Sequence, residues 1–160
     1  MSNRRMTLIL MMVIGGAMVL TPSSFSQSNA AHLAGSWKGA VTPTSPSGLT
    51  PFTSLITFTN DGAVVESRRL LVPASPLGPL LETTGHGAWQ RVDEREFDVH
   101  FVFLLQGAVS GVDIGTDNVH LRLKLDSTDG ILSGTFDSTI KDTFGNPVFS
   151  ASGTYQAIPI

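Results

Sequence analysis

The stretch Phe97–Gln106 reads FDVHFVFLLQ and decides the fold class of this chain. Every second residue from Phe97 to Leu105 is apolar, so an extended backbone would carry one wholly apolar face. Side chains of a β-strand alternate between two faces, and this period of two therefore predicts a strand with one buried side. We expect the remaining strands of the chain to cover that apolar face.

The same alternation recurs along the chain between turn sequences. Further strands are expected at residues 35–41, 52–59, 63–70, 85–92, 119–125, 131–141 and 148–158. Asn60-Asp61-Gly62 is typical of a hairpin turn, because Asn and Asp tolerate turn conformations and Gly adopts positive φ without steric cost. Thr42–Pro51 and Val72–Leu81 are rich in proline, which lacks an amide donor, and we expect both to be loops. Gly107–Asn118 is expected to be a third long connection.

These patterns predict an all-β fold of about eight antiparallel strands, because parallel strands would need long crossover connections. Two architectures fit, an up-and-down barrel and a β-sandwich. Regular hairpin spacing favours the barrel, since a sandwich requires long crossings between its sheets. Closure also removes the unpaired edge strands that invite aggregation.

The N-terminal segment has the three parts of a secretory signal peptide. Arg4 and Arg5 precede the apolar run Met6–Leu20, and the small and polar residues Thr21–Gln27 follow. We expect residues 1–30 to be a signal peptide and leader and residues 31–160 to form a single β-barrel domain. The mature protein is then secreted or periplasmic, with no membrane attachment after cleavage; an uncleaved anchor is the alternative.

Composition excludes several classes of function. The chain has no cysteine, so neither disulfides nor thiolate chemistry contributes. Its net charge is −3 with 14% charged residues and no basic run, which argues against a nucleic-acid partner. It also has no Gly-x-Ser-x-Gly motif and no Gly-rich phosphate loop.

Three short motifs carry a resemblance to a known group. Gly35-Ser36-Trp37 opens the first strand, Gly85–Trp89 (GHGAW) opens a later one, and Gly153-Thr154-Tyr155 lies in the last. With about eight strands in sequence, the chain resembles small secreted bacterial lipocalin-like proteins of the calycin and allene-oxide-cyclase-like kind, most of which lack an assigned function. The resemblance implies a barrel. The chain lacks the Thr-Asp-x-x-Tyr motif and the terminal arginine of true lipocalins, so lipid or retinoid transport is not carried over.

Inside such a barrel, large rings would converge with small residues such as Gly39, Gly134 and Gly153. We expect the interior to bind a small hydrophobic or aromatic molecule. The predicted ligand-binding residues are Trp37, Trp89, Phe101, Phe103, Leu123, Phe136, Tyr155 and His86. An interior that its own rings fill completely is the alternative, and it would leave a structural or interaction protein.

A barrel enzyme of the cyclase or isomerase type is a second hypothesis, because holding a reactive conformer needs few catalytic groups. Its candidates for proton transfer are His86, Glu66 and Tyr155, and no catalytic role is assigned. Asp98 and His100 share the face opposite the aromatic one and are expected to be a surface pair. The histidines have no short metal-ligand spacing, so we expect neither a metal nor another cofactor; they are His32, His86, His100 and His120.

The outward face of the Phe97 strand becomes apolar at Val102 and Leu104. Burial of two aliphatic side chains contributes roughly 3–6 kcal/mol, so we expect this patch to be covered. The apolar loop Val72–Leu81 is one candidate cover. A second copy of the chain is the other, which predicts a homo-oligomer formed through Val102 and Leu104.

Overall fold

The computed structural model describes residues 33–69, 71–72 and 77–160. The predicted signal peptide and leader fall on residues 1–30 and lie outside the described residues. All regular structure in the described part is β. The strands are β1 (Gly35–Ser45), β2 (Phe52–Phe58), β3 (Ala63–Ser67), β4 (Leu71–Val72), β5 (Leu80–Glu82), β6 (Gly85–Asp93), β7 (Glu96–Gly107), β8 (Asp113–Leu125), β9 (Leu132–Asp142) and β10 (Pro147–Pro159).

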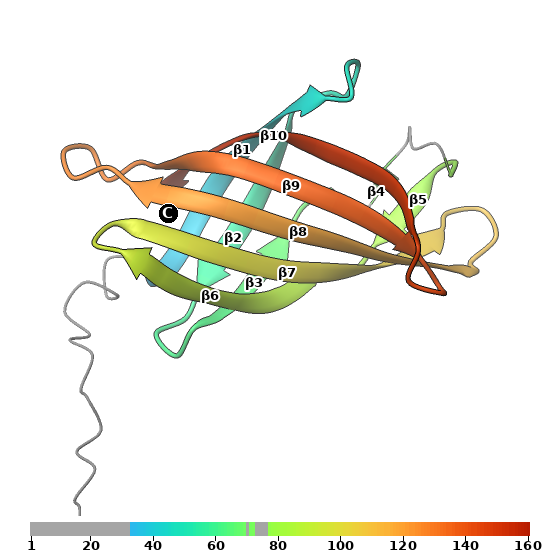
Figure 1. Ribbon diagram of the computed structural model, residues 1–160, viewed down its shortest axis with the longest axis horizontal. Coiled ribbons are helices and arrows are strands. Elements are labelled where there is room, and N and C mark those ends of the chain that lie inside the picture. Colours follow the sequence, from blue (N-terminus) through green and yellow to red (C-terminus); the bar gives the residue numbers. More distant parts are fainter. Residues whose placement is uncertain (1–32, 70, 73–76) are drawn as a thin grey trace, which may run out of the picture.

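Eight of these strands form a closed antiparallel barrel (Figure 1). Their order is β7-β6-β3-β2-β1-β10-β9-β8, and β8 pairs back to β7 to close the sheet. The predicted barrel is therefore confirmed, and the sandwich is excluded. Within the described residues, no helix is long and apolar enough to cross a membrane.

The barrel contains one continuous apolar core. Phe97, Val99, Phe101, Phe103 and Leu105 of β7 are all buried, as the alternating pattern predicts. Trp89 packs edge-on against two other rings, with ring centroids 5.8 Å from Phe97 and 6.2 Å from Phe58. Burial of each such large side chain contributes about 1.5–3 kcal/mol, so this core supplies the main stabilisation of a chain without disulfides.

Two barrel strands are interrupted, and this is the main departure from a regular meander. β4 and β5 pair with each other, and β5 pairs with β7 beyond Gly85, the first residue of β6. Around the break, the Thr83 amide donates to the Leu104 carbonyl at 3.1 Å, and the Leu104 amide donates to Thr83 Oγ1 at 3.1 Å. The predicted loop Val72–Leu81 thus has strand residues at both ends; its residues 73–76 lie outside the described part.

The expected loop Thr42–Pro51 is wrong in its first part. Thr42, Pro43 and Ser45 belong to β1 and pair with β10, although the register shifts between Pro43 and Ser45. Pairing of β1 with β2 ends at Val41. Beyond that point β1 is hydrogen-bonded to β10 alone and has one unpaired side, as an edge strand has, and an edge strand tolerates proline.

The expected connection Gly107–Asn118 is also too long. β8 begins at Asp113, and Asp117 and Asn118 already pair with β7 and β9. The sequence before Val119 is polar and contains Gly115, so it lacks the apolar alternation that marks the rest of the strand. Its strand conformation comes from pairing on both sides and not from local preference.

The outward patch on β7 is not covered within the described residues. Val102 is 39% exposed and Leu104 is 60% exposed. The described part of Val72–Leu81 does not bury them, so the intramolecular cover is not observed there.

Candidate functional site

Seven of the eight predicted ligand-binding residues are buried in the barrel core, namely Trp37, Trp89, Phe101, Phe103, Leu123, Phe136 and Tyr155. The structure does not bring His86 to them, because its side chain is exposed on β6. Among the residues expected for proton transfer, Glu66 and Tyr155 lie inside the barrel and His86 does not.

Rings occupy the space beside several interior glycines. A Cβ atom at Gly39 would lie 2.3 Å from the Tyr155 hydroxyl, and one at Gly153 would lie 2.7 Å from the Phe136 ring. Likewise a Cβ at Gly85 would lie 2.9 Å from the Phe103 ring. These small residues therefore allow rings to pack against the backbone. At these positions the interior is filled by its own rings, which is the alternative that the sequence leaves open.

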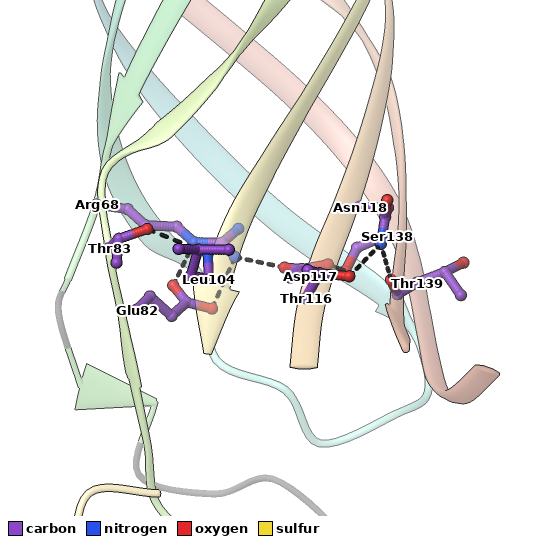
Figure 2. A network of polar contacts seen from close by, with 9 residues as sticks. All are labelled: Arg68, Glu82, Thr83, Leu104, Thr116, Asp117, Asn118, Ser138 and Thr139. Atoms are coloured by element: carbon purple, nitrogen blue, oxygen red, sulfur yellow. Dashed lines mark hydrogen bonds and ion pairs between the residues drawn. The ribbon is translucent and has the colours of Figure 1, made fainter. Parts of the chain in front are cut away.

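A buried ionic network lies toward the end of the barrel that carries β4 and β5 (Figure 2). Arg68 donates to both carboxylate oxygens of Glu82, through Nε at 2.6 Å and Nη2 at 2.8 Å. Its Nη2 also donates to Asp117 Oδ2 at 2.5 Å, and the Ser138 hydroxyl donates to Asp117 Oδ1 at 2.7 Å. The network thus joins residues that follow β3 or lie on β5, β8 and β9.

The guanidinium of Arg68 is held by charge and by aromatic contact. It lies 4.0 Å from the ring centroid of Phe103. Burial would lower the pKa of Arg68, but the carboxylates of Asp117 and Glu82 outweigh it and hold this pKa above its ordinary value. Such a pair is costly to break, because removal of one partner leaves a buried charge uncompensated. We infer that the network fixes this end of the barrel.

A second polar group lies deeper in the interior. Ser54 Oγ, Glu66 Oε2 and the Tyr155 hydroxyl are buried and have no hydrogen-bond partner of good geometry in the described structure. Burial raises the pKa of Glu66 to about 7, although Arg68 and Ser54 act in the opposite direction. Burial also raises the pKa of Tyr155 above its ordinary value. Glu66 is thus a carboxyl group that can exchange a proton near neutral pH.

A cavity of about 510 Å³ opens at the opposite end of the barrel, where the chain ends. It lies between the start of β1, the β6–β7 turn, the β8–β9 turn and the end of β10. Leu125 and Ile160 contribute aliphatic surface and Arg95 a charge, whereas Trp37 and Phe97 belong to the wall but are almost fully buried. The volume falls within the range of about 300–1,000 Å³ that is typical of small-molecule sites.

The indole of Trp37 is fixed at this cavity. Its Nε1 donates to the Leu33 carbonyl at 2.9 Å, and its side chain is almost fully buried. The strand pattern placed Trp37 correctly on the inner face. It could not show the cavity, because four segments distant in sequence form the wall.

The geometry defines a closed eight-stranded antiparallel barrel with one ionic end and one open, partly apolar end. This architecture agrees with the fold that the resemblance to lipocalin-like proteins implied. Comparisons with protein-family models, with curated proteins and with solved structures found no match to this chain.

Proposed function

We propose that this protein is an exported barrel that binds a small, mainly apolar molecule, and that the cavity beside Trp37 is the binding site. The signal-peptide pattern of residues 1–30 supports export. The observation that carries the binding proposal is the cavity of about 510 Å³ at the C-terminal end of the barrel. Membership of the lipocalin-like group is part of this proposal.

The lining of the cavity indicates the kind of molecule. Leu125 and Ile160 offer aliphatic contacts, which favour a hydrocarbon or aromatic body. Charged side chains of both signs, Glu94, Arg95 and Asp126, stand around them. A ligand with an apolar body and a polar group that remains at the rim matches this arrangement.

The packing of the interior explains why the site lies at the mouth. Tyr155, Phe136 and Phe103 occupy the positions beside the interior glycines, and Arg68 holds the far end. A ligand would thus enter from the C-terminal end and rest against the wall beside Trp37, without displacement of the core.

Titration with N-phenyl-1-naphthylamine, an uncharged probe that fluoresces in apolar surroundings, tests the proposal. Wild-type protein should bind one probe molecule per chain with saturation. Ser127 lines the cavity on the β8–β9 turn and is exposed, so Ser127→Trp should fill the site and weaken probe binding by at least about tenfold.

Thr128→Trp is the matched control. Thr128 is the next residue of the same turn and is exposed, but it does not line the cavity. This variant should bind the probe like wild type. Absence of saturable binding in the wild type, or equal binding by the two tryptophan variants, would contradict the proposal.

Glu66 supports a second candidate function, that of a barrel enzyme of the isomerase type. Its pKa of about 7 and the unpartnered polar atoms of Ser54 and Tyr155 suit proton abstraction. Deuterium exchange into a panel of ketones and enones, followed by NMR, tests it. Exchange that depends on Glu66 and is lost in Glu66→Gln would support catalysis; no exchange above the rate in buffer would contradict it.

A further inference from the structure

Two of the four histidines meet on the outer face of the barrel. His100 of β7 lies directly opposite His120 of β8, and the two imidazole rings stack with centroids 4.0 Å apart and an interplanar angle of 12°. Asp98 lies two residues before His100 and therefore on the same face of β7. All three belong to paired strands of the barrel wall, so their backbones are fixed relative to one another.

The carboxylate of Asp98 contacts Nε2 of both rings. His100 Nε2 is 3.1 Å from Asp98 Oδ2, and His120 Nε2 contacts Asp98 Oδ1. One nitrogen from each histidine and one carboxylate oxygen all lie within 4.8 Å of one another. An ionised carboxylate only accepts hydrogen bonds, so Nε2 of each ring is the donor to Asp98.

We propose that Asp98, His100 and His120 form a surface site for a divalent transition-metal ion such as Zn²⁺. Two imidazole nitrogens and one carboxylate oxygen are ligands that zinc, nickel and copper prefer, whereas calcium and magnesium prefer all-oxygen sites. The ion would take the place of the bridging protons. Bonds of roughly 2.0–2.2 Å require the stacked rings to turn toward the ion and the carboxylate to move back, because both nitrogens now lie within hydrogen-bond distance of its oxygens. The outer face leaves room for this, because His100 is 61% exposed.

Three protein ligands leave at least one coordination position for water or for an added ligand. The site is on the outside of the barrel wall, so it is separate from the cavity beside Trp37 and does not depend on the proposed small-molecule function.

Two neighbouring groups modulate the site. Asp137 of β9 lies opposite His120 on the other side, where its carboxylate can accept a hydrogen bond from the Nδ1–H group when Nε2 binds the ion. Arg122 competes for both groups: its Nη1 is 3.2 Å from Asp137 Oδ2, and its Nη2 is 3.5 Å from His120 Nδ1. The positive charge of Arg122 also opposes a bound cation. Removal of this arginine should therefore strengthen metal binding.

Isothermal titration of the untagged protein with Zn²⁺ tests the site. We expect one ion per chain. His100→Gln and His120→Gln should each weaken Zn²⁺ binding by at least about tenfold, because even loss of a group that only supports a ligand typically lowers metal affinity by about this factor. His86→Gln is the matched control, because His86 is another exposed histidine of the barrel wall, on β6. Titration with Mg²⁺ should give no comparable binding.

Arg122→Gln supplies a readout that nonspecific adsorption of zinc would not produce. It should tighten Zn²⁺ binding by about two- to fivefold, the scale of a charge interaction at an exposed position. The proposal is overturned if the wild type does not bind Zn²⁺, if His86→Gln weakens binding as much as His120→Gln does, or if Arg122→Gln weakens it. As a control for folding, each variant should have the same thermal unfolding temperature as the wild type, so that a change in Zn²⁺ affinity reflects the site alone.

Discussion

Replacement of Glu66 by glutamine should make the protein more stable than the wild type at neutral and alkaline pH. In acid this gain should disappear. Glu66 is buried, and desolvation disfavours its ionised form and raises its pKa to about 7 from an ordinary value of 4.5. Ionisation of this carboxyl group therefore costs more in the folded than in the unfolded protein.

The sign and size follow from linkage between proton binding and folding. Because the pKa is higher in the folded state, the stability that goes with protonated Glu66 is fully present below pH 4.5. It is lost as the pH rises through about 7 and is constant above that. The difference between the two pKa values corresponds to about 3 kcal/mol. Glutamine has nearly the same shape and does not ionise, so Glu66→Gln should escape this loss.

Urea unfolding of wild type and Glu66→Gln between pH 4.5 and pH 8.5 measures the effect. Trp37 and Trp89 are both buried, so their fluorescence reports unfolding. The difference in unfolding free energy between variant and wild type should grow by about 3 kcal/mol over this range. With a typical urea dependence of about 2 kcal/mol per molar, the two midpoints should separate by roughly 1.5 M.

Ser54→Ala provides a control that keeps the titrating group. The Ser54 hydroxyl lowers the pKa of Glu66. Its removal should therefore move the loss of stability that accompanies ionisation of Glu66 to higher pH. A stability difference between Glu66→Gln and wild type that is the same at every pH would refute the reasoning, because Glu66 would then ionise equally in both states.

Two further predictions concern the ionic network and self-association. Arg68→Met should destabilise the barrel by about 3–5 kcal/mol in urea unfolding, since it leaves Glu82 and Asp117 buried without their cation, and an unchanged midpoint would contradict this. The exposed pair Val102 and Leu104 should form an interface between copies of the chain. Light scattering should then show a dimer or trimer that Val102→Asp with Leu104→Lys converts into folded monomers, whereas a monomeric wild type would exclude the interface.

The sequence predicted the barrel because its main signals are local. Alternating apolar residues from Phe97 to Leu105 define a strand without knowledge of its neighbours, and Asn60-Asp61-Gly62 defines the turn between β2 and β3. The regular spacing of such hairpins is enough to favour next-neighbour pairing, which the structure confirms for most of the sheet.

Features that depend on distant pairing were not predictable in the same way. His100 and His120 are twenty residues apart, and only the register of β7 against β8 brings their rings together. Arg68 continues the inward side of β3 after Val64 and Glu66, but its partners Glu82 and Asp117 lie on other strands, and only the closure of the barrel brings them to it. The exposed side chain of His86 was predictable, because His86 lies three residues before the inward-facing Trp89 and a period of two places it on the opposite face.

The central claim is that a small apolar molecule binds at the barrel mouth beside Trp37, and the two indole N–H signals in a ¹H–¹⁵N NMR spectrum test it most directly. Trp37 Nε1 donates to Leu33 at the cavity, whereas Trp89 Nε1 donates to the Thr59 carbonyl at 3.0 Å and does not line the cavity. Titration with N-phenyl-1-naphthylamine should shift the Trp37 signal to saturation and move the Trp89 signal less. Equal shifts of both signals, or a shift of Trp89 alone, would contradict the account.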